Sequence, residues 1–215
     1  MRASGPGPTS SLAALLLKLG LMLAACLGGL AACTNPPDPV RFPDLTYAHL
    51  GAIRLAVARI EIVDAYRPPL APPNVEHRMP AAPAATLRRW AQDRLAAAGG
   101  PGSAAAARFV IRDARVTETE LPRTEGLRGL FTTDQGQRYD LRMEAALEVV
   151  EAGSGASGGV AGSVSALATR SRTIAENASL DERERLWFAM VEEAASALTA
   201  ELERRMRQTL ARYIR

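Results

Sequence analysis

The clearest alternation of apolar and polar positions lies over residues 137–151 (QRYDLRMEAALEVVE). Every second residue there is apolar, and most of the residues between them are charged. The apolar positions are Tyr139, Leu141, Met143, Ala145, Leu147 and Val149. A period of two with one apolar face is typical of a strand that is buried on one side and solvated on the other. The pattern therefore predicts a long strand in an antiparallel sheet.

Three further segments predict strands. Residues 53–65 (IRLAVARIEIVDA) alternate with a shift of parity, which a bulge near Ala58 and Arg59 would reconcile. Residues 107–121 (ARFVIRDARVTETEL) give another strand. Residues 160–174 (VAGSVSALATRSRTI) give a fourth, although their alanines also permit a helix.

Two segments have helical periodicity. The first begins near Pro83, a residue that suits the first turn of a helix, and Gly99-Gly100 is expected to end it. The second begins after Ser179, which forms a capping box with Glu182, and is expected to run to about Arg212. Its apolar stripe comprises Trp187, Val191, Ala194, Leu198, Leu202, Met206 and Tyr213.

The element order is therefore strand, helix, three strands, helix (β-α-β-β-β-α). Residues 66–83 hold six of the fourteen prolines and are expected to be loop. A crossover helix packs on one face of a sheet, and the C-terminal helix most simply joins it there. We predict an α+β fold over residues 51–215, a two-layer sandwich of a four-stranded, mainly antiparallel sheet with two helices on one face.

The N-terminal residues have the layout of a signal peptide. Arg2 and Lys18 precede an apolar run, residues 19–32, which is shorter than the about 20 residues that span a bilayer. The run leads into Leu-Ala-Ala-Cys at residues 30–33, which resembles the bacterial lipobox. The resemblance implies that the Cys33 sulfur receives diacylglycerol, that residues 1–32 are removed, and that fatty acids such as palmitate are attached. Two or more acyl chains anchor a protein stably, whereas one chain is marginal.

A second Leu-Ala-Ala-Cys stands at residues 23–26, so Cys26 is the alternative acylation site. Cys33 is favoured because it leaves the full apolar run after Lys18 and is followed by a polar stretch. An ordinary secretory signal or an uncleaved anchor is a further alternative.

The segment after Cys33 is rich in proline and is expected to be an extended tether over residues 33–50. Thr34 follows the cysteine. By resemblance to enterobacterial sorting, this residue implies a lipid-anchored protein of the cell envelope, at the outer membrane and facing the periplasm. With Cys33 acylated and Cys26 removed, the mature domain holds no free thiol and no disulfide.

Charge gives no support for nucleic-acid binding. The whole chain has a formal net charge of +3, but Arg2 and Lys18 contribute two of these charges. The arginines are interleaved with glutamates and form no basic patch.

Motifs for chemistry are weak throughout. The run GSGASGG at 153–159 fits G-x-G-x-x-G but follows an amphipathic strand, so we expect a hairpin turn and no cofactor. His49 and His77 have no second ligand at metal spacing, so no metal is expected. Glu118 and Glu120 are more simply the solvated face of a strand than a carboxylate pair. No catalytic residue is identified, and we expect a protein that is not an enzyme.

One loop is longer than a hairpin requires. Residues 122–136 (PRTEGLRGLFTTDQG) link two predicted strands, where two to five residues would suffice. Its apolar and basic residues are either packed on the end of the sheet or offered to a partner or membrane. The candidate partner-binding residues are Leu127, Leu130, Phe131, Arg123 and Arg128.

The lipobox with this order of elements, over roughly residues 50–212, resembles small envelope lipoproteins. The resemblance is closest to the lipoprotein partner of the lipopolysaccharide translocon and to auxiliary lipoproteins of envelope lipid-transport ABC systems. It implies a scaffold or accessory subunit that binds an envelope protein through the loop or a sheet edge. The alternative is a lipid or glycolipid carrier with a groove between helices and sheet.

We predict that radiolabelled palmitate enters the wild-type protein and that Cys33→Ser abolishes the labelling, because the sulfur is the acyl acceptor. Autoradiography of the immunoprecipitated protein measures it, with Cys26→Ser as the matched control. Equal labelling of wild type and Cys33→Ser would contradict the assignment, and loss of label only in Cys26→Ser would move it to that residue.

Overall fold

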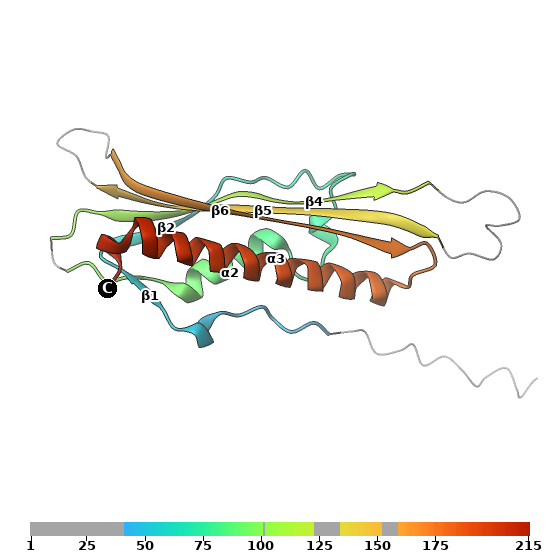
Figure 1. The fold of residues 1–215 in the computed structure, drawn as a ribbon, viewed down its shortest axis with the longest axis horizontal. Coiled ribbons are helices and arrows are strands. Elements are labelled where there is room, and N and C mark those ends of the chain that lie inside the picture. The colour runs from blue at the N-terminus through green and yellow to red at the C-terminus, as the bar shows by residue number, and fades with distance from the viewer. Residues whose placement is uncertain (1–40, 101, 123–133, 152–158) are drawn as a thin grey trace, which may run out of the picture. The chain divides into compact units, whose positions relative to one another are not determined.

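The computed structural model describes residues 41–100, 102–122, 134–151 and 159–215. In this part of the chain the main sheet has the strand order β2-β4-β5-β6. Figure 1 shows the long strands running side by side, with helices α2 and α3 packed on the same face. This arrangement confirms the predicted α+β fold with both helices on one side of a four-stranded sheet. The strands are β2 (Arg59–Asp64), β4 (Ala106–Glu120), β5 (Gln135–Glu151) and β6 (Gly159–Ala175).

The three long strands form an antiparallel meander. β4 pairs with β5 from Ala106↔Val150 to Glu120↔Gln137, and β5 pairs with β6 along nearly its whole length. β2 pairs parallel to β4, and its partners on β4 end at Ile111. The alternation that predicts β5 is confirmed, since its six alternate apolar residues from Tyr139 to Val149 are buried. The helical alternative for residues 160–174 is wrong, because this segment is β6.

The expectation of a single first strand is wrong. The segment forms two strands, β1 (Ile53–Leu55) and β2, separated by a bend at residues 56–58. β1 belongs to a separate two-stranded sheet, in which it pairs parallel to β3 (Leu95–Ala97). The parity shift in the sequence therefore marks a change of sheet and not a bulge. The buried Val57 sits at this bend.

The first predicted helix ends earlier than expected. α2 (Pro83–Arg94) begins at the predicted proline, but it stops five residues before Gly99 because the chain continues as β3. Backbone pairing with β1 extends past β3, since Ala98 N donates to Leu55 O at 2.7 Å. The alanines there favour a helix, and tertiary pairing overrides that preference.

The C-terminal helix α3 (Leu180–Thr209) agrees with the sequence at its start. The capping box is present in both directions, with Glu182 N donating to Ser179 Oγ at 3.3 Å and Ser179 N donating to Glu182 Oε2 at 2.8 Å. Thirty residues give a helix about 45 Å long. It ends at Thr209, and the predicted last turn is instead a short 3-10 helix, Ala211–Tyr213.

The layer between the helices and the sheet is filled by large side chains. Trp90 of α2 packs against Phe109 of β4 with ring centroids 5.5 Å apart. Trp187 of α3 meets Tyr139 of β5 edge to face at 5.4 Å. All four are at most 1% exposed. Burying aromatic side chains of this size contributes a large share of the apolar stabilisation of the domain.

Part of the predicted tether is attached to this domain. Phe42 stacks on Phe188 of α3 with a centroid distance of 5.1 Å. Tyr47 N donates to Asp93 Oδ2 of α2 at 2.9 Å, and Leu45 packs against the core. The pKa of Tyr47 is raised to about 12, first because the phenol is buried and then because Glu192 and Asp93 are near. Residues 33–40 lie outside the described part of the chain.

Gly99 is the glycine that the meeting of the two sheets requires. A Cβ at this position would lie 2.6 Å from the backbone carbon and oxygen of Val57, whereas a Cβ on Gly100 would meet nothing within 4 Å. We predict that Gly99→Ala lowers the free energy of unfolding by about 1–3 kcal/mol, as overpacking does. Urea unfolding followed by circular dichroism measures it.

The matched control is Gly100→Ala, which should change stability by less than about 1 kcal/mol. Equal effects of the two substitutions would show that the close approach at Gly99 is not a constraint.

Candidate functional site

The proline-rich segment between β2 and α2 covers the second half of β4. Val75 N donates to Val116 O, and Glu118 N donates to Pro73 O, both at 2.9 Å. Asn74 and Thr117 form an antiparallel bridge. This short stretch therefore pairs with β4 beyond the end of β2 and occupies backbone groups of β4 that would otherwise lie on an open edge.

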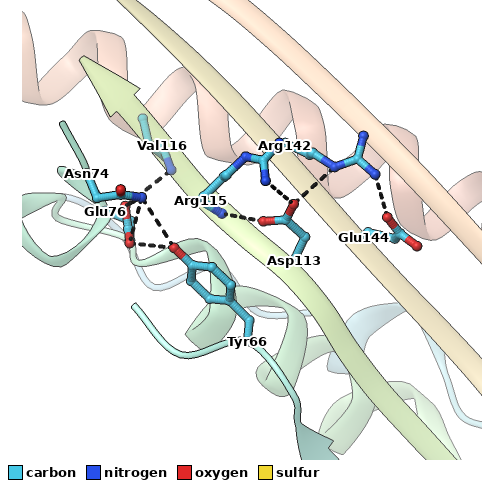
Figure 2. Close-up of polar contacts among 8 residues, drawn as sticks. All are labelled: Tyr66, Asn74, Glu76, Asp113, Arg115, Val116, Arg142 and Glu144. Carbon is cyan, nitrogen blue, oxygen red and sulfur yellow. Dashed lines mark hydrogen bonds and ion pairs between the residues drawn. The ribbon is translucent and has the colours of Figure 1, made fainter. Parts of the chain in front are cut away.

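A buried carboxylate completes this pairing (Figure 2). Glu76 is 4% exposed, and its Oε2 accepts from Val116 N at 3.2 Å. Its Oε1 accepts from the Tyr66 hydroxyl at 2.6 Å, and the Asn74 amide donates to both oxygens at 3.3 and 3.4 Å. Three donors therefore compensate the loss of hydration of this buried group. Burial and the bond to Glu76 raise the pKa of Tyr66 well above its usual value, so the phenol stays neutral.

A second acidic group marks an irregularity of β4. The register with β5 shifts between Ile111 and Asp113, as in a β-bulge. Asp113 accepts from Arg115 N at 3.2 Å and from Arg142 Nε on β5 at 3.0 Å. Arg142 also donates to Glu144 at 2.6 Å (Figure 2).

Similar pairs continue over the sheet face, including Arg112 with Glu148 at 3.2 Å and Arg138 with Asp140 at 2.9 Å. The charged positions of β4 and β5 thus pair with one another. Such ion pairs on an exposed face contribute little stability individually, but they keep the face polar.

The Pro72–Arg78 segment and the end of β4 enclose a groove of about 490 Å³. Pro72, Pro73 and Val75 supply its apolar surface, and Glu118 and Glu120 extend from the end of β4. The remaining lining residues are Asn74, His77 and Arg78. We call this cavity the β4 groove.

One charged residue of the β4 groove, Arg78, lies over a buried tryptophan. The Arg78 guanidinium lies 5.8 Å from the centre of the Trp187 ring and 3.8 Å from Glu118. Arg78 is half exposed, so this ion pair is weak, and the ring contact holds the guanidinium at the rim. Burial, followed by the charge of Glu118, raises the pKa of Tyr139 beneath it.

The structure brings together residues that the sequence presents separately. His77, Glu118 and Glu120 line the same β4 groove, whereas the exposed His49 lies in the short 3-10 helix Ala48–Leu50 and is not among its lining residues. Among the described residues, no group of three or more His, Cys, Asp or Glu side chains could hold a metal ion.

The other predicted site residues lie outside the described ranges. These are Cys33, its alternative Cys26, and the loop residues Leu127, Leu130, Phe131, Arg123 and Arg128. Their assignments remain predictions. Within the described ranges, no helix is both long and apolar enough to cross a membrane.

Sequence reasoning did not identify Glu76 or Asp113. In the sequence, each is an ordinary acidic residue. Glu76 has a role because Val116 N of β4 needs an acceptor, and Asp113 has one because the register between β4 and β5 shifts there. The local signal for Glu76 is a charged residue next to a valine inside a proline-rich loop, and this signal is weak.

Two solved structures are similar to this chain at low sequence identity. No family model matches the chain, and no curated protein matches it. The structure of rare lipoprotein B from Shewanella oneidensis is similar with a TM-score of 0.33 and 11% identity, over 70% of this chain and 95% of that chain. A PelC dodecamer from Paraburkholderia phytofirmans is similar with a TM-score of 0.20 and 16% identity, over 74% of this chain and 92% of that chain. These TM-scores are too low to establish a common fold or function.

We predict that Glu76→Ala lowers the free energy of unfolding by about 2–4 kcal/mol, because Val116 N and the Tyr66 hydroxyl lose their acceptor in a buried place. Urea unfolding measures the change. Glu61→Ala is the control, since Glu61 is exposed on β2 and its ion pair is with the exposed Arg59, so its loss should change stability by about 0.5 kcal/mol or less. Comparable losses in both variants would argue against a special role for Glu76.

Proposed function

We propose that this protein is a non-enzymatic, lipid-anchored lipoprotein of the bacterial cell envelope. It acts as a scaffold or accessory subunit of an envelope assembly or transport machine, anchored at the outer membrane and facing the periplasm. The lipobox at residues 30–33 supports the anchor and the compartment. The observation that carries the accessory role is the β4 groove, which offers a binding surface at the end of the sheet.

The β4 groove is suited to binding a protein segment because its walls are already fixed. Backbone hydrogen bonds from Val75 and Glu118 hold the Pro72–Arg78 segment on β4, and Glu76 secures it from beneath. A preformed surface loses little conformational entropy on binding. Its lining combines apolar proline and valine side chains with charged ones, and protein interfaces likewise combine apolar and polar residues.

The predicted partner loop continues directly from this groove in the sequence. Glu120 lines the groove and is the last residue of β4, two residues before Pro122, where the predicted loop begins. We propose that Leu127, Leu130 and Phe131 add apolar contacts to the same partner.

The alternative function, a lipid or glycolipid carrier, requires space between the helices and the sheet. In the described part of the chain, this layer is occupied by Trp90, Trp187, Tyr139 and Phe109. The packing therefore favours an accessory role over a carrier. Native mass spectrometry of the protein without its anchor separates the two functions, because a carrier retains its ligand.

The test is site-specific photocrosslinking in native membranes. A photoreactive amino acid at position 77, in the β4 groove, should crosslink one envelope protein. The same amino acid at position 59 is the control, because Arg59 is exposed on β2, away from the groove. Changing Leu127, Leu130 and Phe131 to Gly or Ser should reduce the yield by about tenfold, the loss of about 1.4 kcal/mol of binding.

Crosslinks of equal yield from positions 59 and 77, or none from position 77, would refute the groove as the partner surface. An unchanged yield in the loop variant would remove the loop from that surface.

A further inference from the structure

A second cavity, of about 240 Å³, lies where β1 meets the end of α3 and the last residues of the chain. We call it the arginine pocket, because four of its lining side chains are guanidinium groups and one is a carboxylate. Its formal side-chain charge therefore has an excess of three positive charges. The charged residues are Arg54, Arg94, Arg207, Arg215 and Glu203.

Two of these arginines are held directly opposite each other. Leu55 of β1 and Ile214 form an antiparallel bridge, and Arg215 N donates to Arg54 O at 2.9 Å. In an antiparallel pair this register places Arg54 and Arg215 side by side on the same face. Like charges at such positions destabilise the pair unless a counter-charge lies between them.

The one carboxylate of the arginine pocket is already shared. Glu203 accepts from Arg94 Nη2 at 2.8 Å and from Arg207 Nη2 at 3.0 Å. Arg94 is only 6% exposed and also donates to the Leu50 and Gly51 carbonyls, so its side chain is held in one position in the wall of the pocket. Among the contacts of the described residues, none involves the Arg54 guanidinium. Arg215 Nη1 donates to the Ala98 carbonyl at 2.9 Å, and among the described residues no side-chain carboxylate forms an ion pair with Arg54 or Arg215.

The arginine pocket also has an apolar side. Met206 is fully buried in its wall, while Leu50 is 54% exposed, one of the few large apolar side chains with such exposure in the described ranges. Ile53 and Ile214 are further lining residues, and both are partly buried. Positively charged side chains next to exposed apolar surface are suited to a ligand that has both an anionic group and a hydrocarbon part.

We propose that the arginine pocket binds a phosphate-bearing ligand. Guanidinium groups match phosphate oxygens with paired, charge-assisted hydrogen bonds, and Arg54, Arg207 and Arg215 have exposed positions from which to make them. The phosphate belongs either to a lipid headgroup, whose chains contact Leu50, or to a soluble phosphate ester. This site is independent of the β4 groove and of the partner proposed for it.

The test uses the full chain in neutral detergent at low salt. Inorganic phosphate should raise its melting temperature more than chloride at equal ionic strength. In the double variant Arg54→Gln, Arg207→Gln, phosphate binding should weaken by at least about tenfold. Without phosphate, this variant should melt close to the wild type, because the lost Arg207–Glu203 pair is exposed and weak and the like-charge contact at Arg54 is relieved. The melting temperature without phosphate therefore distinguishes a loss of phosphate binding from a loss of stability.

The matched control is Arg59→Gln, Arg204→Gln, which removes one exposed arginine from a strand and one from α3 outside the arginine pocket. It should keep the full response to phosphate. No phosphate-specific rise in the wild type, or an equal rise in both double variants, would overturn the proposal.

The source of the phosphate is decided by two probes with the same headgroup. Dihexanoyl phosphatidic acid and glycerol 3-phosphate carry the same phosphate with and without acyl chains. Tighter binding of the former by about tenfold, removed by Leu50→Asn, assigns a lipid headgroup. Equal binding assigns a soluble ester, and binding of neither overturns the proposal.

Discussion

The structure depends on how the protein covers an edge of β4. This strand has fifteen residues, but its neighbour β2 has six. Backbone donors and acceptors beyond β2 need partners, and an open edge invites pairing with other chains. Pro73, Val75 and the carboxylate of Glu76 provide those partners. The route of the proline-rich segment, the buried charge at Glu76 and the β4 groove all follow from this one mismatch of strand lengths.

The two faces of the sheet have different consequences for binding. One face is covered by α2 and α3 (Figure 1). Aromatic residues fill the contact layer between these helices and the sheet. The other face carries ion pairs such as Arg112 with Glu148, in which each charge is already compensated. To bind either face, a ligand would have to displace packed aromatic residues or existing ion pairs, which would offset the free energy of binding. The β4 groove and the arginine pocket instead lie at the end of β4 and beside β1.

The sequence predicts those elements whose signal is local. The alternation from Tyr139 to Val149 and the capping box of Ser179 and Glu182 are fixed by neighbouring residues, so β5 and the start of α3 are predicted well. β3 could not be predicted, because three residues rich in alanine become a strand only by pairing with β1, some forty positions earlier in the chain.

The same reason limits prediction of the sites. His77 and Glu118 were noticed separately, but nothing local shows that the loop carrying one lies along the strand carrying the other. Likewise, Arg54 and Arg215 stand near opposite ends of the domain sequence, and only the long-range bridge between Leu55 and Ile214 makes them neighbours. The sequence shows residue types that are common in binding sites, but it does not show which of them lie next to each other in the fold.

That bridge has a further consequence for the order of folding. β1 pairs with β3 some forty positions later, whereas its backbone hydrogen bonds with residues 213–215 join segments far apart in the chain. Closing so long a loop is slow, because its entropy is lost before the contacts form. The contacts between β1 and residues 213–215 therefore form late in folding, whereas β1 can pair with β3 as soon as residues 95–97 are in place.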